Sequence, residues 1–210
     1  MIYRIFGPEE SQFDESIVTL MNECLGPEYY SRVKLGIRRQ RGFVCVAFDE
    51  FLPVGVTTAY MLTDLELSAF LPEGEWRDKL YGSDVALFES SAVRPSYRGR
   101  GIGKRLFQMR LDWAKDLDAY YALALAWRSG QHESIGLHLE LGGHVIYEAG
   151  HSFGGVPCVR CAPAECTCVG DIVLYELHTH EWEFIAKVQE FENDFLMCIC
   201  GETRNAPKAL

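Results

Sequence analysis

Residues 93–104 read V-R-P-S-Y-R-G-R-G-I-G-K. A largely apolar run, 85–93, leads into this stretch, and apolar residues at three- and four-residue spacing follow from Ile102 onward. These patterns predict a strand, a basic glycine-rich turn and an amphipathic helix, in that order. The first turn of a helix leaves backbone N–H groups unpaired at the positive end of its dipole, and glycines let a ligand approach without meeting a Cβ. The stretch therefore favours a site for a phosphate-bearing ligand.

Two other phosphate-binding loops do not fit this stretch. The P-loop pattern G-x-x-x-x-G-K-[ST] is absent, because Arg105 follows Lys104 and no hydroxyl is placed to hold magnesium. The dinucleotide fingerprint needs G-x-G-x-x-G, whereas Gly99, Gly101 and Gly103 are spaced G-x-G-x-G. The string instead reads R-x-x-G-x-G directly after V-x-P-x-Y. A glycine-rich surface turn before an ordinary helix is the alternative interpretation.

The R-x-x-G-x-G string resembles the acyl-CoA pyrophosphate loop of the GNAT superfamily of N-acetyltransferases. The expected order of elements over about residues 1–178, β-α-α-β-β-β-α-β-α-β-β, is similar to that fold, with an early helix at 28–35 and an ambiguous segment at 64–83. The resemblance implies an α/β (α+β) fold. Its centre is a mixed, mostly antiparallel sheet of about seven strands, splayed between strands 4 and 5 and flanked by helices. A C-terminal helix and tail are expected at 179–210.

The resemblance also implies a cosubstrate and a reaction. Acetyl-CoA would donate its acetyl group to a primary amine of a small molecule or peptide, which attacks the thioester directly in a ternary complex. The pantetheine arm would pair with the backbone near the end of the fourth strand, and the pyrophosphate would take amides from the loop. The residues so implied as cofactor-binding are Ser91, Ala92, Val93, Arg98, Gly99, Arg100, Gly101, Ile102, Gly103 and Lys104.

Two side chains are candidates for proton transfer. An amine acceptor arrives protonated, so a base is needed, and Glu89 lies on the strand before the loop. Its alternative interpretation is a carboxylate paired with a nearby arginine. Family members often carry a tyrosine in the pattern N-x-x-A-x-x-L-Y, whereas residues 131–138 read Q-H-E-S-I-G-L-H and put His138 at the tyrosine position. An imidazolium there would reprotonate the CoA thiolate, and the alternative is a packed histidine with a satisfied ring.

Six of the eight cysteines lie beyond residue 157. A disulfide scaffold is disfavoured, because the chain is not small and its N-terminus shows no export pattern. The loop 151–168 carries the pattern C-x2-C-x4-C-x-C, whose four sulfurs can surround one tetrahedral, structural zinc ion. The alternative is a cysteine-rich loop without metal. The candidate ligands are Cys158, Cys161, Cys166 and Cys168, with Cys198, Cys200 and His151 as further donors.

Composition excludes several classes of protein. A net charge of −10 argues against a general nucleic-acid binder, and no apolar run reaches the ~18 residues of a membrane span. We therefore expect no nucleic-acid partner, no membrane association and a cytoplasmic location, and exposed strand edges leave a homodimer open. Two functions compete with the acetyltransferase. One is a catalytically weak GNAT-fold module that binds acyl-CoA for regulation, and the other is a zinc or redox sensor.

Overall fold

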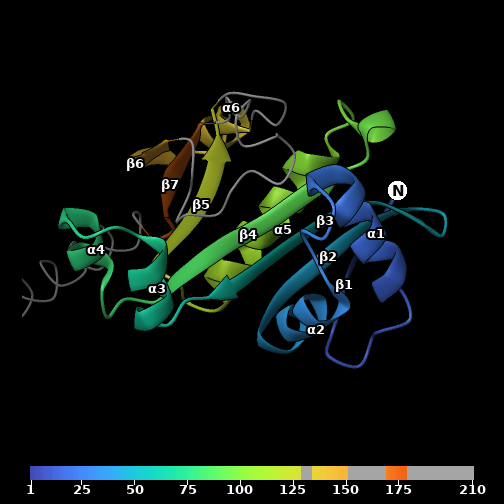
Figure 1. The fold of residues 1–210 in the computed structure, drawn as a ribbon, viewed down its shortest axis with the longest axis horizontal. Helices are drawn as coiled ribbons and strands as arrows, with labels where there is room; N and C mark the ends of the chain where they lie inside the picture. Colours follow the sequence, from blue (N-terminus) through green and yellow to red (C-terminus); the bar gives the residue numbers. More distant parts are fainter. Residues whose placement is uncertain (129–133, 151–168, 179–210) are drawn as a thin grey trace, which may run out of the picture. The chain divides into compact units, whose positions relative to one another are not determined.

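The computed structural model describes residues 1–128, 134–150 and 169–178 (Figure 1). The chain divides into two units, Met1–Leu177 and His178–Leu210, and nearly all of the second lies outside the described residues. The strands of the first unit are β1 (Ile2–Ile5), β2 (Gly42–Asp49), β3 (Leu52–Met61), β4 (Val85–Val93), β5 (Tyr121–Trp127), β6 (His144–Gly150) and β7 (Gly170–Glu176). Its helices are α1 (Asp14–Leu25), α2 (Arg32–Arg41), α3 (Asp64–Phe70), α4 (Glu75–Leu80), α5 (Ile102–Asp116) and α6 (Ile135–Glu140), with a 3-10 turn, η1, at Pro95–Tyr97.

The strands of the described residues form one sheet with the order β1-β2-β3-β4-β5-β7-β6. Each neighbouring pair is antiparallel except β4 and β5, which run parallel. Two parallel strands need a crossover connection, which is nearly always right-handed. Helix α5 lies between β4 and β5 in the chain and forms this connection. The expected mixed sheet of seven strands is confirmed.

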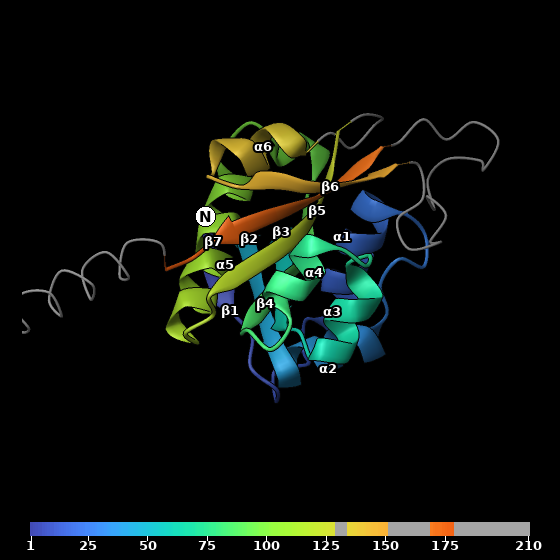
Figure 2. The same ribbon diagram turned by 90° about the vertical axis from the view of Figure 1, so that its left-hand side faces the viewer.

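Helices cover both faces of the sheet, which Figure 2 shows nearly edge-on between α5 and the layer of α1 to α4. Strand β2 makes the division clear, because its side chains alternate between the faces. Cys45 and Ala47 pack in the cluster that includes α5, whereas Val44 and Val46 pack in the cluster that includes α1. A third apolar cluster joins α3 and α4 to β4, β5 and β7. Burial on both faces explains why these strands read as nearly continuous apolar runs.

The second helix begins later than the sequence predicts. We expected a helix at 28–35, but α2 starts at Arg32 and continues to Arg41. Glu28 has a positive φ of 59°, which a right-handed helix does not contain. Ser31 then caps the helix by accepting a hydrogen bond from the Lys34 amide at 3.1 Å. The shift leaves Tyr29 and Tyr30 in the connection between α1 and α2, and it places Arg38 on the helix.

The ambiguous segment 64–83 forms the two short helices α3 and α4. Thr63 and Glu66 form a reciprocal capping box at the start of α3. Leu67, Leu71 and Leu80 from this segment are buried against the sheet. None of the helices in the described ranges combines the length and the apolar character that a bilayer span demands.

Candidate active site

Strands β4 and β5 separate partway along their length. They pair only through residues 85–88 and 121–124, although β4 continues to Val93 and β5 to Trp127. Beyond this fork, β4 still pairs with β3, and β5 still pairs with β7. In the described part of the chain, the facing edges of residues 89–93 and 125–127 therefore have no strand between them. Such edges can present backbone donors and acceptors to an extended ligand, although the N–H and the carbonyl of Trp127 already bond to Ser134.

A glycine-rich loop lies at the far end of the unpaired part of β4. Gly99 and Gly101 have φ values of 74° and 78°, so both use the left-handed conformation that favours glycine. Gly101 is the N-cap residue of α5, and no side chain caps this helix. A Cβ at Gly99 or Gly101 would meet no atom within 4 Å, so open space adjoins the first turn. The first amides of the 15-residue helix α5 are thus presented to an anion.

The cationic side chains of this loop bond to the protein itself. Arg98 Nε donates to the Val93 carbonyl at 3.1 Å, and Arg100 Nη2 donates to the Ser96 carbonyl at 3.1 Å. Lys104 Nζ lies 2.6 Å from a Glu140 carboxylate oxygen on α6. The loop is therefore braced by its own side chains. The ten residues predicted to bind the cofactor are brought together at the end of β4, the loop and the first turn of α5.

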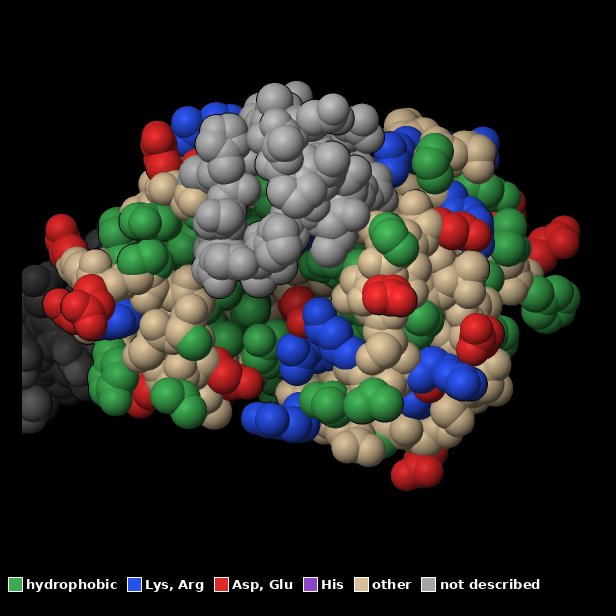
Figure 3. All heavy atoms as spheres, viewed as in Figure 1, with side chains coloured by type: hydrophobic (Ala, Val, Ile, Leu, Met, Phe, Trp, Pro, Cys, Tyr) green, Lys and Arg blue, Asp and Glu red, His purple; other side chains and the backbone are tan. Residues whose placement is uncertain are grey.

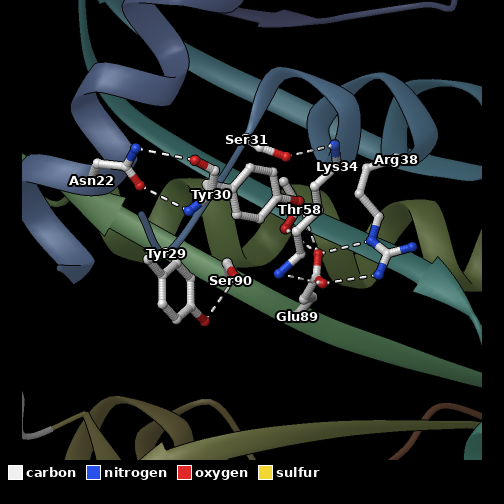
Figure 4. Close-up of polar contacts among 9 residues, drawn as sticks. All are labelled: Asn22, Tyr29, Tyr30, Ser31, Lys34, Arg38, Thr58, Glu89 and Ser90. Carbon is white, nitrogen blue, oxygen red and sulfur yellow. Dashed lines mark hydrogen bonds and ion pairs between the residues drawn. The ribbon is translucent and has the colours of Figure 1, made fainter. Parts of the chain in front are cut away.

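Glu89 is the first residue of β4 beyond the fork, and it accepts bonds at both carboxylate oxygens (Figure 4). Arg38 holds it at two points, with Nε and Nη2 each 2.9 Å from one oxygen. Lys34 Nζ lies 3.2 Å from Oε1. The hydroxyls of Tyr30 and Thr58 donate to Oε2 at 2.9 and 3.2 Å. The geometry matches the alternative interpretation of a paired carboxylate.

The pKa of Glu89 reflects two opposed effects. Burial raises the pKa, but the hydrogen bonds from Arg38 and the charge of Lys34 outweigh it, so the net pKa lies below its usual value. Glu89 is consequently ionised throughout the neutral range.

Two adjacent tyrosines from the connection between α1 and α2 complete this site. Asn22 fixes the backbone of Tyr30 by accepting from its amide at 2.8 Å and donating to its carbonyl at 3.0 Å. The hydroxyl of Tyr29 lies 3.2 Å from the Ser90 hydroxyl on β4. Lys34 Nζ lies 4.5 Å from the centre of the Tyr30 ring. Sequence reasoning missed these residues, since their only signal is a Tyr-Tyr pair before a helix with cations four residues apart.

His138 lies in the interior, on α6. Its Nδ1 is 2.6 Å from the Tyr175 hydroxyl, and its ring meets Phe107 edge-to-face at 5.5 Å. Burial and the nearby charge of Arg110 lower the pKa of His138 to about 4. Arg110 is itself buried between the rings of Phe88 and Phe107. His138 is therefore neutral at neutral pH, and the structure favours the packed histidine over the imidazolium.

The predicted zinc ligands and the C-terminal helix lie outside the described residues. Cys24 and Cys45, which the structure does describe, are buried. Within the described ranges, no group of three His, Cys, Asp or Glu side chains is placed to hold a metal ion.

The chain is similar in structure to several proteins of known fold. They include the ribosomal-protein-S18-alanine N-acetyltransferase from Escherichia coli (TM-score 0.59, 12% identity, covering 84% of this chain and 94% of that one). A polyamine N-acetyltransferase from Drosophila melanogaster matches with a TM-score of 0.60 and 16% identity, over 84% of this chain and all of the other. The GNAT-like decarboxylase GphF, in complex with isobutyryl-CoA, matches with a TM-score of 0.60 and 18% identity, over 85% and 100%.

A search among curated proteins finds no match. The sequence model of the acetyltransferase (GNAT) family matches residues 6–142, which is more than half of the chain. These residues include the fork, the glycine-rich loop, Glu89 and His138. The chain therefore belongs to the GNAT acetyltransferase family.

Proposed function

We propose that the protein is an acetyl-CoA-dependent N-acetyltransferase that acts on a primary amine. The observation that carries this proposal is the fork between β4 and β5 with the amide-presenting loop at its far end. A diphosphate at the loop would accept several main-chain hydrogen bonds, each worth about 1.5–3 kcal/mol. The pantetheine arm would then run back along residues 89–93, about 16 Å of extended chain, toward the fork. The thioester would reach Glu89 and Ser90.

The transfer proceeds by direct attack in this proposal. The neutral amine nitrogen bonds to the thioester carbon, the carbonyl becomes a tetrahedral oxyanion, and the C–S bond then breaks. An acceptor that arrives as an ammonium ion first loses one proton to solvent. The attacking nitrogen then gives up a second proton, and the CoA thiolate takes one up. Because both oxygens of Glu89 already accept bonds, we assign it chiefly to holding Arg38 and Tyr30 at the fork, and it serves as a proton acceptor only weakly.

His138 is proposed as a hydrogen-bond donor to the leaving sulfur. The Tyr175 hydroxyl has one proton and lies 2.6 Å from Nδ1 and 3.3 Å from the His138 carbonyl. This role requires the tautomer in which the hydroxyl donates to Nδ1, because the ring proton then resides on Nε2 and a neutral imidazole donates through that nitrogen. This role needs no imidazolium, so it is compatible with the lowered pKa.

The second candidate function is an acyl-CoA-binding module without turnover. The saturated Glu89 and the neutral His138 favour it, and the similarity to a decarboxylase shows that this fold does not fix the reaction.

Calorimetry with acetyl-CoA and thiol release with a panel of amines separate these functions. The panel includes a polyamine and a peptide with N-terminal alanine, the acceptors suggested by the names of two similar proteins. Binding with thiol release supports the transferase, and binding without release for any amine supports the module. If calorimetry detects no heat of binding with coenzyme A or its thioesters, both candidate functions are overturned.

A further inference from the structure

The charges at the fork do not balance. Two cations of α2, Lys34 and Arg38, contact Glu89 there, and Figure 3 shows Lys and Arg side chains beside a hollow in this face of the molecule. Glu89 contacts Lys34 and Arg38, and the charge of Glu66 on α3 interacts with Arg38 and Arg41. Among the described residues, Lys34 and Arg38 thus share the single carboxylate of Glu89, which leaves one positive charge in excess beside it. This surplus stands out in a chain whose net charge is −10.

Lys34 is the cation with donors to spare. The two-point bond to Arg38 already uses one lone pair on each oxygen of Glu89, and the hydroxyls of Tyr30 and Thr58 use more. Lys34 Nζ has three N–H groups, and among the described residues Glu89 is its one oxygen partner. Its side chain is 36% exposed, so it reaches the solvent side of the cluster.

An amine acceptor enters this site as an ammonium ion. Glu89 has no free oxygen to receive it, and a simple amine would add a second uncompensated positive charge close to Lys34. Like charges at such separations repel, most strongly where water is excluded. An acceptor that carries its own carboxylate adds no net charge, and its carboxylate can bind the spare N–H groups of Lys34.

We propose that the acceptor is an amine with a carboxylate a few atoms away, and that Lys34 binds this carboxylate. The proposal rests on the acetyltransferase function proposed above and names the substrate class of the same site. Tyr29 and Tyr30 bound the place of Lys34 Nζ, which lies 5.2 and 4.5 Å from the centres of their rings. A free amino acid and a peptide with an acidic second residue both supply this chemistry.

The experiment compares matched acceptors in a thiol-release assay at saturating acetyl-CoA. One arm pairs L-alanine with L-alaninamide, and the other pairs peptides that begin Ser-Asp and Ser-Asn. A linear diamine serves as the purely cationic acceptor. Each rate is referred to the concentration of unprotonated amine, because a carboxylate and an amide change the amine's own pKa differently. The arm with the larger preference identifies the source of the carboxylate.

The carboxylate of at least one pair should raise kcat/KM by about tenfold, chiefly through KM, which corresponds to one charge-assisted hydrogen bond. Lys34→Gln should remove most of this preference, and Lys34→Arg should retain it. Arg32→Gln is the matched control, since Arg32 lies on the same helix, is exposed and pairs only loosely with Glu15 at 3.5 Å. It removes the same charge and should leave the preference intact.

Two outcomes overturn the inference by itself, without contradicting the proposed function. Efficient acetylation with equal kcat/KM within both pairs, or with the diamine preferred, contradicts it and leaves the transferase function standing. A preference for carboxylates that survives in Lys34→Gln contradicts the role of Lys34. Absence of thiol release with every acceptor instead contradicts the proposed function, and this inference falls with it.

Discussion

The Tyr175 hydroxyl lies 2.6 Å from Nδ1 of His138, and both side chains are buried, at 3% and 7% exposure. The pair joins β7 to α6 beneath the ring of Phe107. Because burial and Arg110 lower the pKa of His138 to about 4, the folded protein holds this ring neutral where an unfolded chain would protonate it. The pair therefore links folding stability to pH.

Acidification should destabilise the protein through His138. Between pH 6.5 and about pH 4 the unfolded state binds a proton that the folded state does not, so the free energy of unfolding rises with pH across this window. The stability that neutral His138 contributes is present in full above pH 6.5. By pH 4 the free energy of unfolding has fallen by roughly 3 kcal/mol through this residue. Urea denaturation at half-unit pH steps measures the slope. His138→Asn should be less stable at neutral pH and should lack that slope, and an unchanged slope in the variant would rule out this linkage.

Replacing Gly101 should weaken both the fold and cofactor binding. Gly101→Ala strains a left-handed residue at about 1–2 kcal/mol, although its Cβ meets no atom. We also expect it to change the direction of the first amides of α5, which we propose bind the diphosphate. Gly82→Ala is the matched control, because Gly82 has a φ of 76° and equally open space outside this loop. Both variants should lose similar stability in thermal melts, but only Gly101→Ala should bind coenzyme A more weakly in calorimetry. Equal affinity for coenzyme A in both variants would exclude the loop as its binding site.

The Arg38–Glu89 pair should be strongly coupled. Arg38→Met leaves a mostly buried carboxylate with only part of its compensation, and we expect a loss of about 2–4 kcal/mol in the free energy of unfolding. Glu89→Gln removes the charge but retains an oxygen for Tyr30 and Thr58. A double-mutant cycle by urea denaturation should give a coupling energy above about 1 kcal/mol. Additive effects would show that the two-point geometry contributes little to stability.

The cysteine run remains a sequence prediction. If Cys158, Cys161, Cys166 and Cys168 hold structural zinc, protein purified without a metal-binding tag should contain about one equivalent per chain. Less than roughly a tenth of an equivalent would reject a tight site. The sensor alternative adds its own expectation, because chelation or peroxide should then change the affinity for acetyl-CoA or the rate of transfer.

Periodicity and spacing predicted the local parts of the molecule, and the family resemblance supplied the seven-stranded sheet. The strand, loop and helix around residues 93–104 depend on neighbouring residues, so periodicity and glycine spacing were sufficient to place them. The start of α2 was misplaced because the preceding residues also have a helical pattern. The single capping bond of Ser31 nevertheless sets where the helix begins.

Long-range contacts explain what the sequence could not predict. Glu89 meets partners 51, 59 and 31 residues away, and His138 meets Tyr175 across 37 residues. No spacing rule reports such meetings, because they follow from how the sheet is assembled. Glu89 and His138 were therefore predictable as members of the site, whereas their partners and protonation states were not.

The brace formed by Arg98 and Arg100 has a consequence for how the loop binds an anion. Both guanidinium groups bond to carbonyls of their own segment, so the recognition surface there consists of peptide units that every amino acid carries. Substituting either arginine should then weaken the binding of an anion less than a change in the backbone path would. Gly99 and Gly101 set that path through their positive φ angles, so the shape of the loop depends on these two residues more than on any single charge.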